Sequence, residues 1–461
     1  MPRTVAQVCQ NHDSSQRGIP HLLRLEQLKG LDLYESSVEE IQQLLSEGHF
    51  TSVDYVEFCF RRIHSVNPYL ECIIETNPEA VEIAAELDKE RRQVDGSSSG
   101  SAVAVSANIV PISFGTETDT SIIGPASING VVGIKPTVGL TSRAGVVPIS
   151  KSMDTVGSFG RTVADAVHGL NAIVGIDERD AITCSPSRLQ REDYSMYLTT
   201  KASLKNARFG LPNKRCWEFV TKDIKEKALG VLEAIKEAGA DVVDVDFPCA
   251  EDRISADGKW DWTYGKPSES EFSVVKVEAY NGINSYLSEL SDTRMKTLED
   301  IIKYNQENSG TEGAEPGDHP AFPVGQDNLQ QIAQSSGIET DTYYQALKYT
   351  QRKCRTEGID AALKDEKHDK IFDALILFDR KGAGQQLAAQ AGYPIICIPI
   401  GVDSAGLPFS LSLQHTAWKE DVLIRWASAI EDLVRGISGW RPTPQYRDHL
   451  SKDIPVVDKS C

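Results

Sequence analysis

The sequence has few of the features that mark secreted, membrane or metal-binding proteins. No apolar run reaches the length of a membrane span, and residues 1–8 are not followed by the apolar segment that a signal peptide requires. The nine cysteines are scattered from Cys9 to Cys461 without a C-x-x-C pair, and the histidines form no cluster at metal-ligand spacing. We therefore expect a cytoplasmic protein with free thiols that uses no metal and no cofactor.

The chain also has fewer positively charged than negatively charged residues. The 461 residues include 48 Lys and Arg against 67 Asp and Glu, which gives a net charge of −19. A surface of that sign does not attract nucleic acid or an anionic membrane, so we expect neither as a partner. The chain is long enough to bury a sizeable core, and its composition leaves the oligomeric state open.

Two segments rich in serine and glycine are the most informative part of the chain. They are residues 96–102 (GSSSGSA) and 115–121 (GTETDTS), with the apolar residues 109–114 between them. Flexible linkers have the same composition, but a linker would continue into polar sequence. Here apolar residues typical of a packed helix and a strand follow at once, so the sequence predicts two turns inside a folded core.

The first segment also matches the G-x-S-x-G pattern of the nucleophile elbow in α/β-hydrolases. An elbow follows a buried strand that lifts its serine to the top of a sheet. Residues 89–95 (KERRQVD) are charged instead and have no strand character. The context therefore argues against an elbow.

A longer series of motifs resembles the amidase signature family of amide hydrolases. After the two Ser/Gly segments come GVVGIKPTVGL at 130–140, DTVG at 154–157 and RTVADA at 161–166, in the order of that family. Weaker matches follow in the C-terminal third, among them GYPI at 392–395 and IPIG at 398–401. The motif variants are most similar to those of the family's fungal members.

The resemblance implies an α/β protein with the amidase signature fold, in which helices cover both faces of a central mixed sheet, here with a shortened core. It also implies a single amidase-like domain over residues 1–461. Its expected parts are an N-terminal helical layer at 1–92, the signature core at 96–180, a variable substrate-facing region at 200–370, and C-terminal strands and a helix at 371–445.

Hydrolysis of an amide needs an activated nucleophile, donors for the oxyanion and a proton for the departing nitrogen. Enzymes without a catalytic histidine combine serine with a lysine whose pKa is lowered by burial or by a neighbouring cation. By resemblance, Ser121 is the nucleophile. Ser97, 24 residues earlier, is a bridging serine in a cis peptide, and Ser98 is its hydroxyl-bearing neighbour.

The same resemblance assigns the oxyanion hole to the backbone N–H groups of Thr118, Asp119 and Thr120, together with that of Ser121. Successive amides of a tight turn can converge on one anion. The turn departs from the family pattern at Thr120, where the family usually has glycine. A Cβ there is strained if the turn requires a positive φ. A turn conformation open to any residue is the alternative, and the sequence leaves both open.

A second departure is a missing segment. The resemblance implies a lysine-bearing strand before the first Ser/Gly segment, but only residues 93–95 separate that segment from a charged helix end. Residues 18–20 (GIP) copy a fragment of the lysine motif without its Lys-Asp, which indicates coincidence. Lys89 is expected in a solvated helix end, and Lys135 and Lys151 are expected in structural roles.

Two functions therefore stay open. One is an amidase-family hydrolase that cleaves a small-molecule amide through a serine acyl-enzyme, with a rate reduced by the absent lysine. The other is a catalytically impaired pseudo-amidase that acts as a binding or regulatory protein. Loss of the segment is also expected to leave an unpaired sheet edge and exposed apolar surface.

The hydrophobic pattern predicts further elements. Helices are expected over residues 38–46, 53–64, 162–173 and 224–238, and a further helix from residue 77 onward. Buried strands are expected over residues 242–245, 372–378 and 395–400, with a shorter alternating strand at 409–413 and a loop at 308–318. The aromatic residues Trp260, Trp262 and Tyr264 either line an apolar groove or pack on the core, and their alternation favours packing.

Overall fold

The computed structural model describes most of the chain. The described residues are 27–70, 72–73, 76, 98–185, 193–258, 261–317, 325–365, 367–378, 384–404 and 406–437. The predictions for Ser97, Lys89, Trp260, residues 18–20 and the helix from residue 77 lie outside the described residues.

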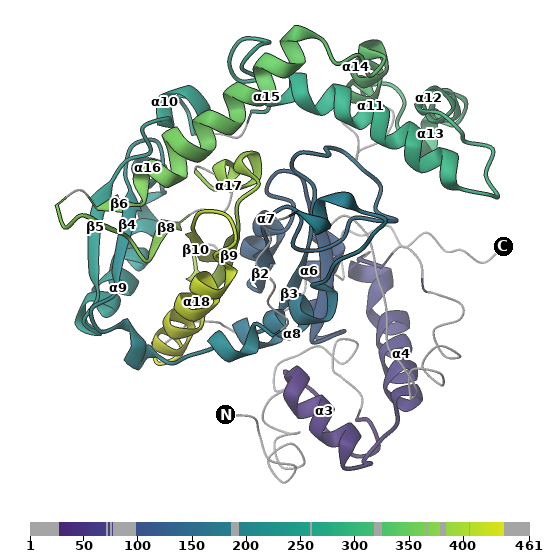
Figure 1. Cartoon of the computed structure of the whole chain (residues 1–461). Coiled ribbons are helices and arrows are strands. Elements are labelled where there is room, and N and C mark those ends of the chain that lie inside the picture. The colour runs from purple at the N-terminus through teal and green to yellow at the C-terminus, as the bar shows by residue number, and fades with distance from the viewer. Residues whose placement is uncertain are drawn as a thin grey trace.

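An eight-stranded mixed sheet forms the centre of the molecule (Figure 1). In spatial order its strands are β1 (Ile112–Glu117), β3 (Thr155–Gly160), β2 (Val132–Lys135), β9 (Ile395–Val402), β10 (Pro408–Gln414), β8 (Ala374–Phe378), β4 (Arg208–Pro212) and β5 (Asp241–Val245). Neighbours from β1 to β8 are antiparallel, whereas β4 is parallel to both β8 and β5. The predicted central mixed sheet is confirmed.

Helices cover both faces of this sheet, as predicted. One face packs on α8 (Val163–Ile173), α9 (Lys222–Glu237) and α18 (Glu420–Val434), and the other on α6 (Ser98–Ser106), α7 (Ile123–Asn129) and α17 (Gln386–Ala391). Strand β9 shows why. Its residues Ile396 and Ile398 belong to the apolar cluster on the face covered by α8, α9 and α18, whereas Ile395 and Cys397 belong to the cluster on the opposite face. Side chains alternate across a strand, so a strand that is apolar throughout must be covered twice.

Most elements predicted from hydrophobic periodicity are present. The helix at 38–46 is α3 (Val38–Ser46), and the helices at 162–173 and 224–238 are α8 and α9, the latter leading into β5. The helix predicted at 53–64 is α4 (Ser52–Leu70), which is longer than expected. Its cap is Thr51, whose hydroxyl accepts the Asp54 N–H at 3.1 Å.

The alternating strand predicted at 409–413 is β10, and one further prediction is wrong in its details. In β10 the serines are buried like the apolar residues, because Ser410 and Ser412 are 0 % exposed. Their hydroxyls are hydrogen-bonded to Ser127 and Gln385 of the covering helical layer, at 2.7 and 2.8 Å. Part of the loop predicted at 308–318 is a short helix, α13 (Ser309–Glu312).

A curved row of helices arches over one side of the sheet (Figure 1). It contains α10 (Ala250–Arg253), α11 (Glu271–Glu289), α12 (Leu298–Glu307), α13, α14 (Asp327–Ser335) and α15 (Asp341–Cys354). Separate small apolar clusters join α11 to α15 and α11 to α12 and α14. Trp262 packs against Phe272 of α11 with ring centroids 4.8 Å apart, which agrees with the predicted packing role.

Strand β1 is the last strand at its end of the sheet, and among the described residues it pairs only with β3. A cavity of about 1300 Å³ lies beside it, lined by residues of α3, α4, β1 and α8. Ile112 and Phe114 of β1 contribute to this lining.

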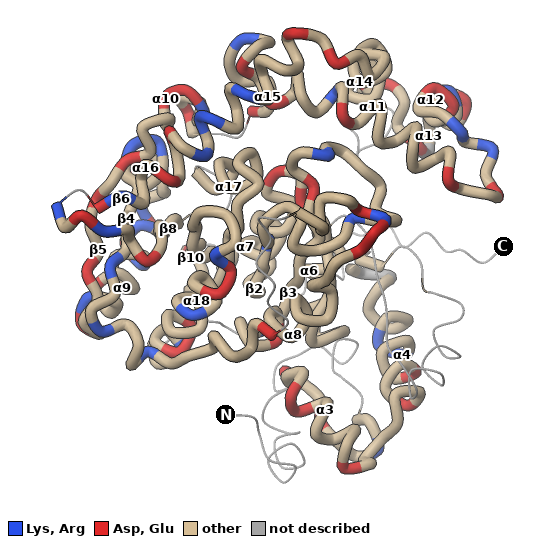
Figure 2. Tube along the Cα trace, in the orientation of Figure 1, with Lys and Arg blue, Asp and Glu red and all other residues tan. Residues whose placement is uncertain are grey.

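Charged residues of both signs occur along the arch and the outer helices (Figure 2). None of the helices within the described ranges is both long and apolar enough to cross a membrane.

Candidate active site

The two Ser/Gly segments meet at β1. The first is not a turn throughout, because α6 begins at Ser98, and the second starts within β1. The Ser98 hydroxyl donates to the Thr116 carbonyl at 2.8 Å and accepts the Thr116 N–H at 3.1 Å. A Cβ on Gly115 would lie 2.5 Å from Ser98 Oγ and 2.7 Å from the Phe159 ring, so only glycine permits this approach.

Ser121 lies in the tight turn that joins β1 to α7, and its side chain is half-buried. The preceding residue, Thr120, has a φ of 58°, and its carbonyl accepts the Gly124 N–H at 2.8 Å. A β-branched residue in this left-handed region is unusual and strained. The alternative that the turn uses a conformation open to any residue is therefore wrong.

Glu117 closes the turn from inside. Its buried carboxylate accepts the N–H groups of Ile122 at 2.7 Å and Ile123 at 3.0 Å, and the Thr120 N–H also donates to it. Burial raises the pKa of Glu117, against the opposing influence of Lys135 and these N–H groups. The Thr120 N–H is therefore engaged within the turn.

The side chain of Thr118 anchors the turn to β3. Its hydroxyl donates at 2.7 Å to Asp154, the residue just before β3. The other oxygen of Asp154 accepts the N–H groups of Ile149 and Ser150, each at 2.8 Å. Burial raises the pKa of Asp154 while these three donors lower it.

Asp119 connects the turn to the arch. Its side chain lies near Glu271, the first residue of α11, and lowers the pKa of that carboxyl. Glu271 is 1 % exposed and accepts from the Gln390 side chain at 2.7 Å, and Arg253 donates to Gln390 at 2.8 Å. Burial raises the pKa of Glu271, against the opposing influence of Asp119, Arg253 and Gln390.

Lys135 lies behind the turn and is completely buried. Its Nζ donates to the carbonyl oxygens of Tyr393 at 2.6 Å and Pro136 at 3.1 Å. Burial lowers its pKa to about 8, while Glu117, Glu420 and Asp119 act in the opposite direction. Its recorded hydrogen bonds are thus to backbone carbonyls, in agreement with the expected structural role.

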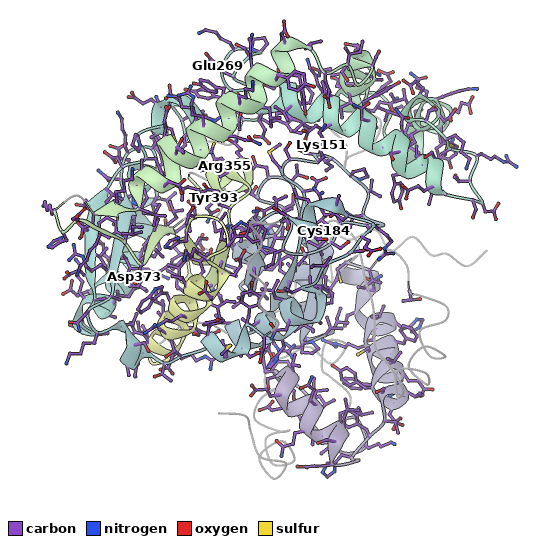
Figure 3. All side chains as sticks on the ribbon, in the orientation of Figure 1. Lys151, Cys184, Glu269, Arg355, Asp373 and Tyr393 are labelled. Atoms are coloured by element: carbon purple, nitrogen blue, oxygen red, sulfur yellow. The ribbon has the colours of Figure 1, made fainter. Side chains whose placement is uncertain are left out.

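Lys151 lies between the arch and the signature core (Figure 3). Its side chain is 60 % exposed and pairs with Glu339 at 2.6 Å. This surface ion pair also agrees with a structural role. Among the described residues, no lysine is recorded in a hydrogen bond to Ser98 or Ser121.

The structure thus gathers Thr118, Asp119, Thr120 and Ser121 in one turn, and Ser98, at the start of α6, is hydrogen-bonded to Thr116 of the adjoining strand β1. Sequence reasoning missed the partners that fix this turn. Asp154 could have been suspected, because it begins the DTVG motif. No local sequence pattern identifies Glu271 as a neighbour of the turn. It stands 152 positions after Asp119, in the region that was expected to be variable.

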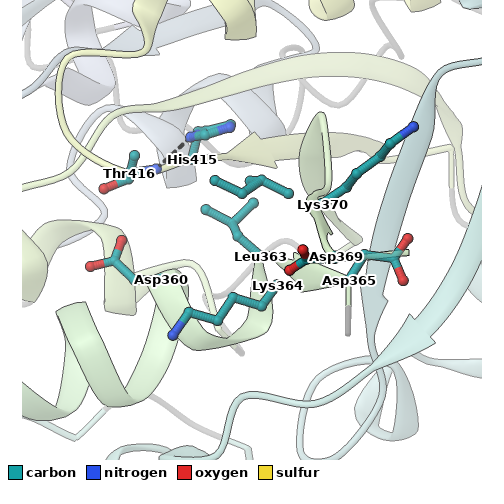
Figure 4. Close-up of a pocket in the computed structure, with 9 residues that line it drawn as sticks. Asp360, Leu363, Lys364, Asp365, Asp369, Lys370, His415 and Thr416 are labelled. Carbon is teal, nitrogen blue, oxygen red and sulfur yellow. Dashed lines mark hydrogen bonds between the residues drawn. The ribbon is translucent and has the colours of Figure 1, made fainter. Parts of the chain in front are cut away.

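A second cavity, of about 520 Å³, lies at the outer edge of the sheet (Figure 4). It is lined by residues of the α16 (Asp360–Ala362) to β7 (Lys370–Ile371) segment and by His415 and Thr416 after β10. None of the predicted site residues lines it. The described part of the chain has no group of three or more His, Cys, Asp or Glu side chains that could hold a metal ion.

Comparison with known proteins shows similarity over most of the chain. Residues 89–424 match the sequence profile of the Amidase family. A Schizosaccharomyces pombe protein, provisionally described as amidase C869.01, is 36 % identical, with 95 % of this chain and 91 % of that protein covered. That alignment spans 534 positions, more than the 461 residues of this chain, so it contains gaps opposite residues of the yeast protein.

Solved structures show the same similarity. The native peptide amidase from Stenotrophomonas maltophilia has 28 % identity and a TM-score of 0.77, with 90 % of this chain and 99 % of that chain covered. The peptide amidase PAM, in complex with the competitive inhibitor chymostatin, has 28 % identity and a TM-score of 0.75, with 90 % and 100 % covered.

Proposed function

This chain belongs to the amidase family, and from that premise we propose that it hydrolyses the carbon–nitrogen bond of a small-molecule amide through a serine acyl-enzyme. The observation that carries the proposal is the turn after β1. It presents Ser121 just before α7, and hydrogen bonds hold the Thr118 side chain to Asp154 and the Ile122 and Ile123 N–H groups to Glu117. A nucleophile needs such fixed surroundings, because small errors in orientation slow attack strongly.

In the proposed reaction the Ser121 hydroxyl attacks the amide carbonyl, the amine leaves with a proton, and water releases the acid from the acyl-enzyme. We assign the oxyanion to the backbone N–H groups of Thr118, Asp119 and Ser121. Thr120 was expected to contribute as well, but its N–H is hydrogen-bonded to Glu117 and is a weaker candidate.

Proton transfer is assigned to Ser97, as the bridging serine, with Ser98 in a supporting role. The Ser98 hydroxyl both donates to and accepts from Thr116, which suits it to holding β1 rather than to moving protons. The gaps opposite the yeast protein support the view that this chain lacks a segment that relatives carry. Without a lysine base, we expect a residual acceleration of about 10³–10⁴ over water.

We propose peptide amides as the first substrates to test, since two similar structures are peptide amidases. The test of the chemistry itself needs no substrate. The purified protein is exposed to a fluorophosphonate probe and its intact mass is recorded, with Ser121→Ala as the variant and Ser288→Ala, an exposed serine of α11, as the matched control.

The parent and Ser288→Ala are expected to gain one probe mass, while Ser121→Ala gains none. Chymostatin is expected to slow labelling if it binds here as it binds the similar peptide amidase. A folded parent that takes up no probe under conditions that label a known serine hydrolase would contradict the proposal and favour a pseudo-amidase.

A further inference from the structure

Helix α11 carries two buried carboxylates on one face. Glu271 and Glu278 are 1 % and 3 % exposed and stand seven residues apart, which is about two helical turns. Glu278 points toward the signature core, because its hydrogen bonds reach Ser150 and Ser152 of that core, whereas Glu271 accepts from Gln390 of α17 and lies near Asp119. Buried carboxylates are rare unless their oxygens are satisfied, so their partners show what the helix holds.

Glu278 binds the loop that precedes β3. Its Oε2 accepts the Ser150 hydroxyl at 2.5 Å and the Ser152 N–H at 3.1 Å. Its Oε1 accepts the Ser152 hydroxyl at 2.6 Å and the Tyr343 hydroxyl, from α15, at 2.9 Å. Four donors on one carboxylate use its accepting capacity fully. Glu278 therefore joins two helices of the arch to residues 150–152.

The same loop is bound directly to the nucleophile turn. Ser150 donates its hydroxyl to Glu278 and its N–H to Asp154. Asp154 in turn accepts the Thr118 hydroxyl at 2.7 Å. A continuous series of hydrogen bonds thus runs from α11 through Ser150 and Asp154 to Thr118, three residues before Ser121.

Glu271 supplies a second, independent connection from α11. It lies near Asp119, and it accepts a hydrogen bond from Gln390 of α17, which in turn accepts from Arg253 of α10. The side chain of Thr118 is therefore connected to α11 by hydrogen bonds, and that of Asp119 lies beside the first residue of α11. These are two of the residues whose N–H groups would face a developing oxyanion.

We propose that α11 is a positioning element for the nucleophile turn, with Glu278 acting through Ser150, Asp154 and Thr118 to fix the backbone that presents Ser121. The catalytic consequence rests on the function proposed above, whereas the structural connection does not. N–H donors that are displaced by about 1 Å stabilise the oxyanion much less. Ser121 in a loosened turn is therefore expected to react more slowly.

Hydrogen exchange tests the connection without any need for turnover. The N–H groups of Ile122 and Ile123, which donate to Glu117, report on the turn. The N–H groups of Ile149 and Ser150, which donate to Asp154, report on the loop. Thr118→Val keeps the side-chain shape and removes the hydrogen bond to Asp154. Glu278→Ala removes the hydrogen bond from Ser150, at the other end of the series. Glu278→Gln is the conservative variant, and Glu289→Gln, exposed at the end of the same helix, is the control.

We expect turn amides to exchange at least about tenfold faster in Thr118→Val and Glu278→Ala, less so in Glu278→Gln, and at the parent rate in Glu289→Gln. If Glu278→Ala speeds exchange in the loop alone and leaves the turn unchanged, the loop is not coupled to the turn and the proposal is overturned. Circular dichroism and the melting temperature establish that each variant is folded.

The rate of labelling by the fluorophosphonate probe tests the consequence. It is expected to fall about tenfold in Thr118→Val at an unchanged probe affinity, because the change alters orientation rather than binding. Equal rates in the parent and Thr118→Val would overturn the positioning role. A parent that fails to label contradicts the proposed function instead, and the exchange data then still decide whether α11 holds the turn.

Discussion

Thr120 keeps a β-branched side chain at a φ of 58°, in a position where glycine would meet no steric penalty. Such backbone strain destabilises the folded state by about 1–3 kcal/mol. Glycine relieves this strain, but its greater freedom in the unfolded chain reduces the gain in stability by about 0.5–1 kcal/mol. We predict that Thr120→Gly raises the free energy of unfolding by about 1 kcal/mol in urea titrations.

The control for this change is Thr116→Gly, in the neighbouring strand β1. Thr116 has no positive φ, so glycine relieves nothing there and is expected to destabilise the protein by about 1 kcal/mol. If both variants lose stability equally, the turn is not strained at Thr120.

His415, which lines the second cavity, gives the protein an acid-sensitive residue (Figure 4). Its side chain is 5 % exposed, and its Nδ1 accepts the Thr416 N–H at 2.8 Å. Burial lowers its pKa to about 4, with a further contribution from Lys419. The neutral ring is therefore the native form, whereas in the unfolded chain the ring protonates near pH 6.5.

Between pH 6.5 and 4 the unfolded state thus binds more protons at this position, and stability falls as the pH falls. The loss attributable to His415 reaches about 3 kcal/mol. We predict that the stability difference between the parent and His415→Asn shrinks by this amount as the pH is lowered through that window. A difference independent of pH would show that His415 titrates as it does in the unfolded chain.

The contact between α6 and β1 depends on one hydroxyl. Ser98 is 1 % exposed and satisfies both the N–H and the carbonyl of Thr116, on the side of β1 that faces away from β3. Removing the hydroxyl leaves two buried backbone groups without their partner, which costs about 1–3 kcal/mol. We predict that loss for Ser98→Ala in thermal and urea unfolding.

Ser99→Ala is the matched control, because Ser99 is on the same helical turn and is exposed. Its stability is expected to stay within about 0.5 kcal/mol of the parent. Similar losses in both variants would point to helix propensity rather than to the Ser98–Thr116 contact.

The elements differ in how far the sequence predicts them. Helices α8 and α9 have one apolar face and clear boundaries, so their periodicity identifies them. Helix α11 has no such signal, because its first three turns bury Glu271, Ser273 and Glu278 together with apolar residues. Its polar side chains are buried because partners elsewhere in the chain satisfy them, and periodicity carries no information about those partners.

The same contrast applies to the candidate site. Ser121 and the residues of its turn are predicted from a contiguous motif. Asp119 and Glu271, by contrast, are brought together by tertiary packing, and no pattern in either segment indicates the contact. The left-handed Thr120 falls between these cases, because the sequence raises the question of positive φ and only the folded backbone answers it.

At the scale of the whole molecule, negative charge is in excess. The net charge is −19, and acidic residues occur along the arch and the outer helices (Figure 2). Like charges repel more strongly in a compact chain than in an unfolded one, which destabilises the native state. Local ion pairs such as Lys353–Asp252, at 2.7 Å, oppose this repulsion, but exposed pairs contribute little.

Salt is therefore expected to stabilise the protein at neutral pH. Raising NaCl from about 0.01 to about 0.1 M shortens the Debye length from about 30 to about 10 Å, which screens repulsion between distant charges more than contact pairs. We predict a higher melting temperature at the higher salt concentration.

The double variant Glu233→Gln, Glu237→Gln should raise stability in low salt and reduce the salt dependence. Both residues are exposed near the C-terminal end of α9, so the change removes two negative charges from the unfavourable end of the helix dipole. If salt lowers the melting temperature instead, screened ion pairs outweigh the net repulsion, and the prediction is wrong.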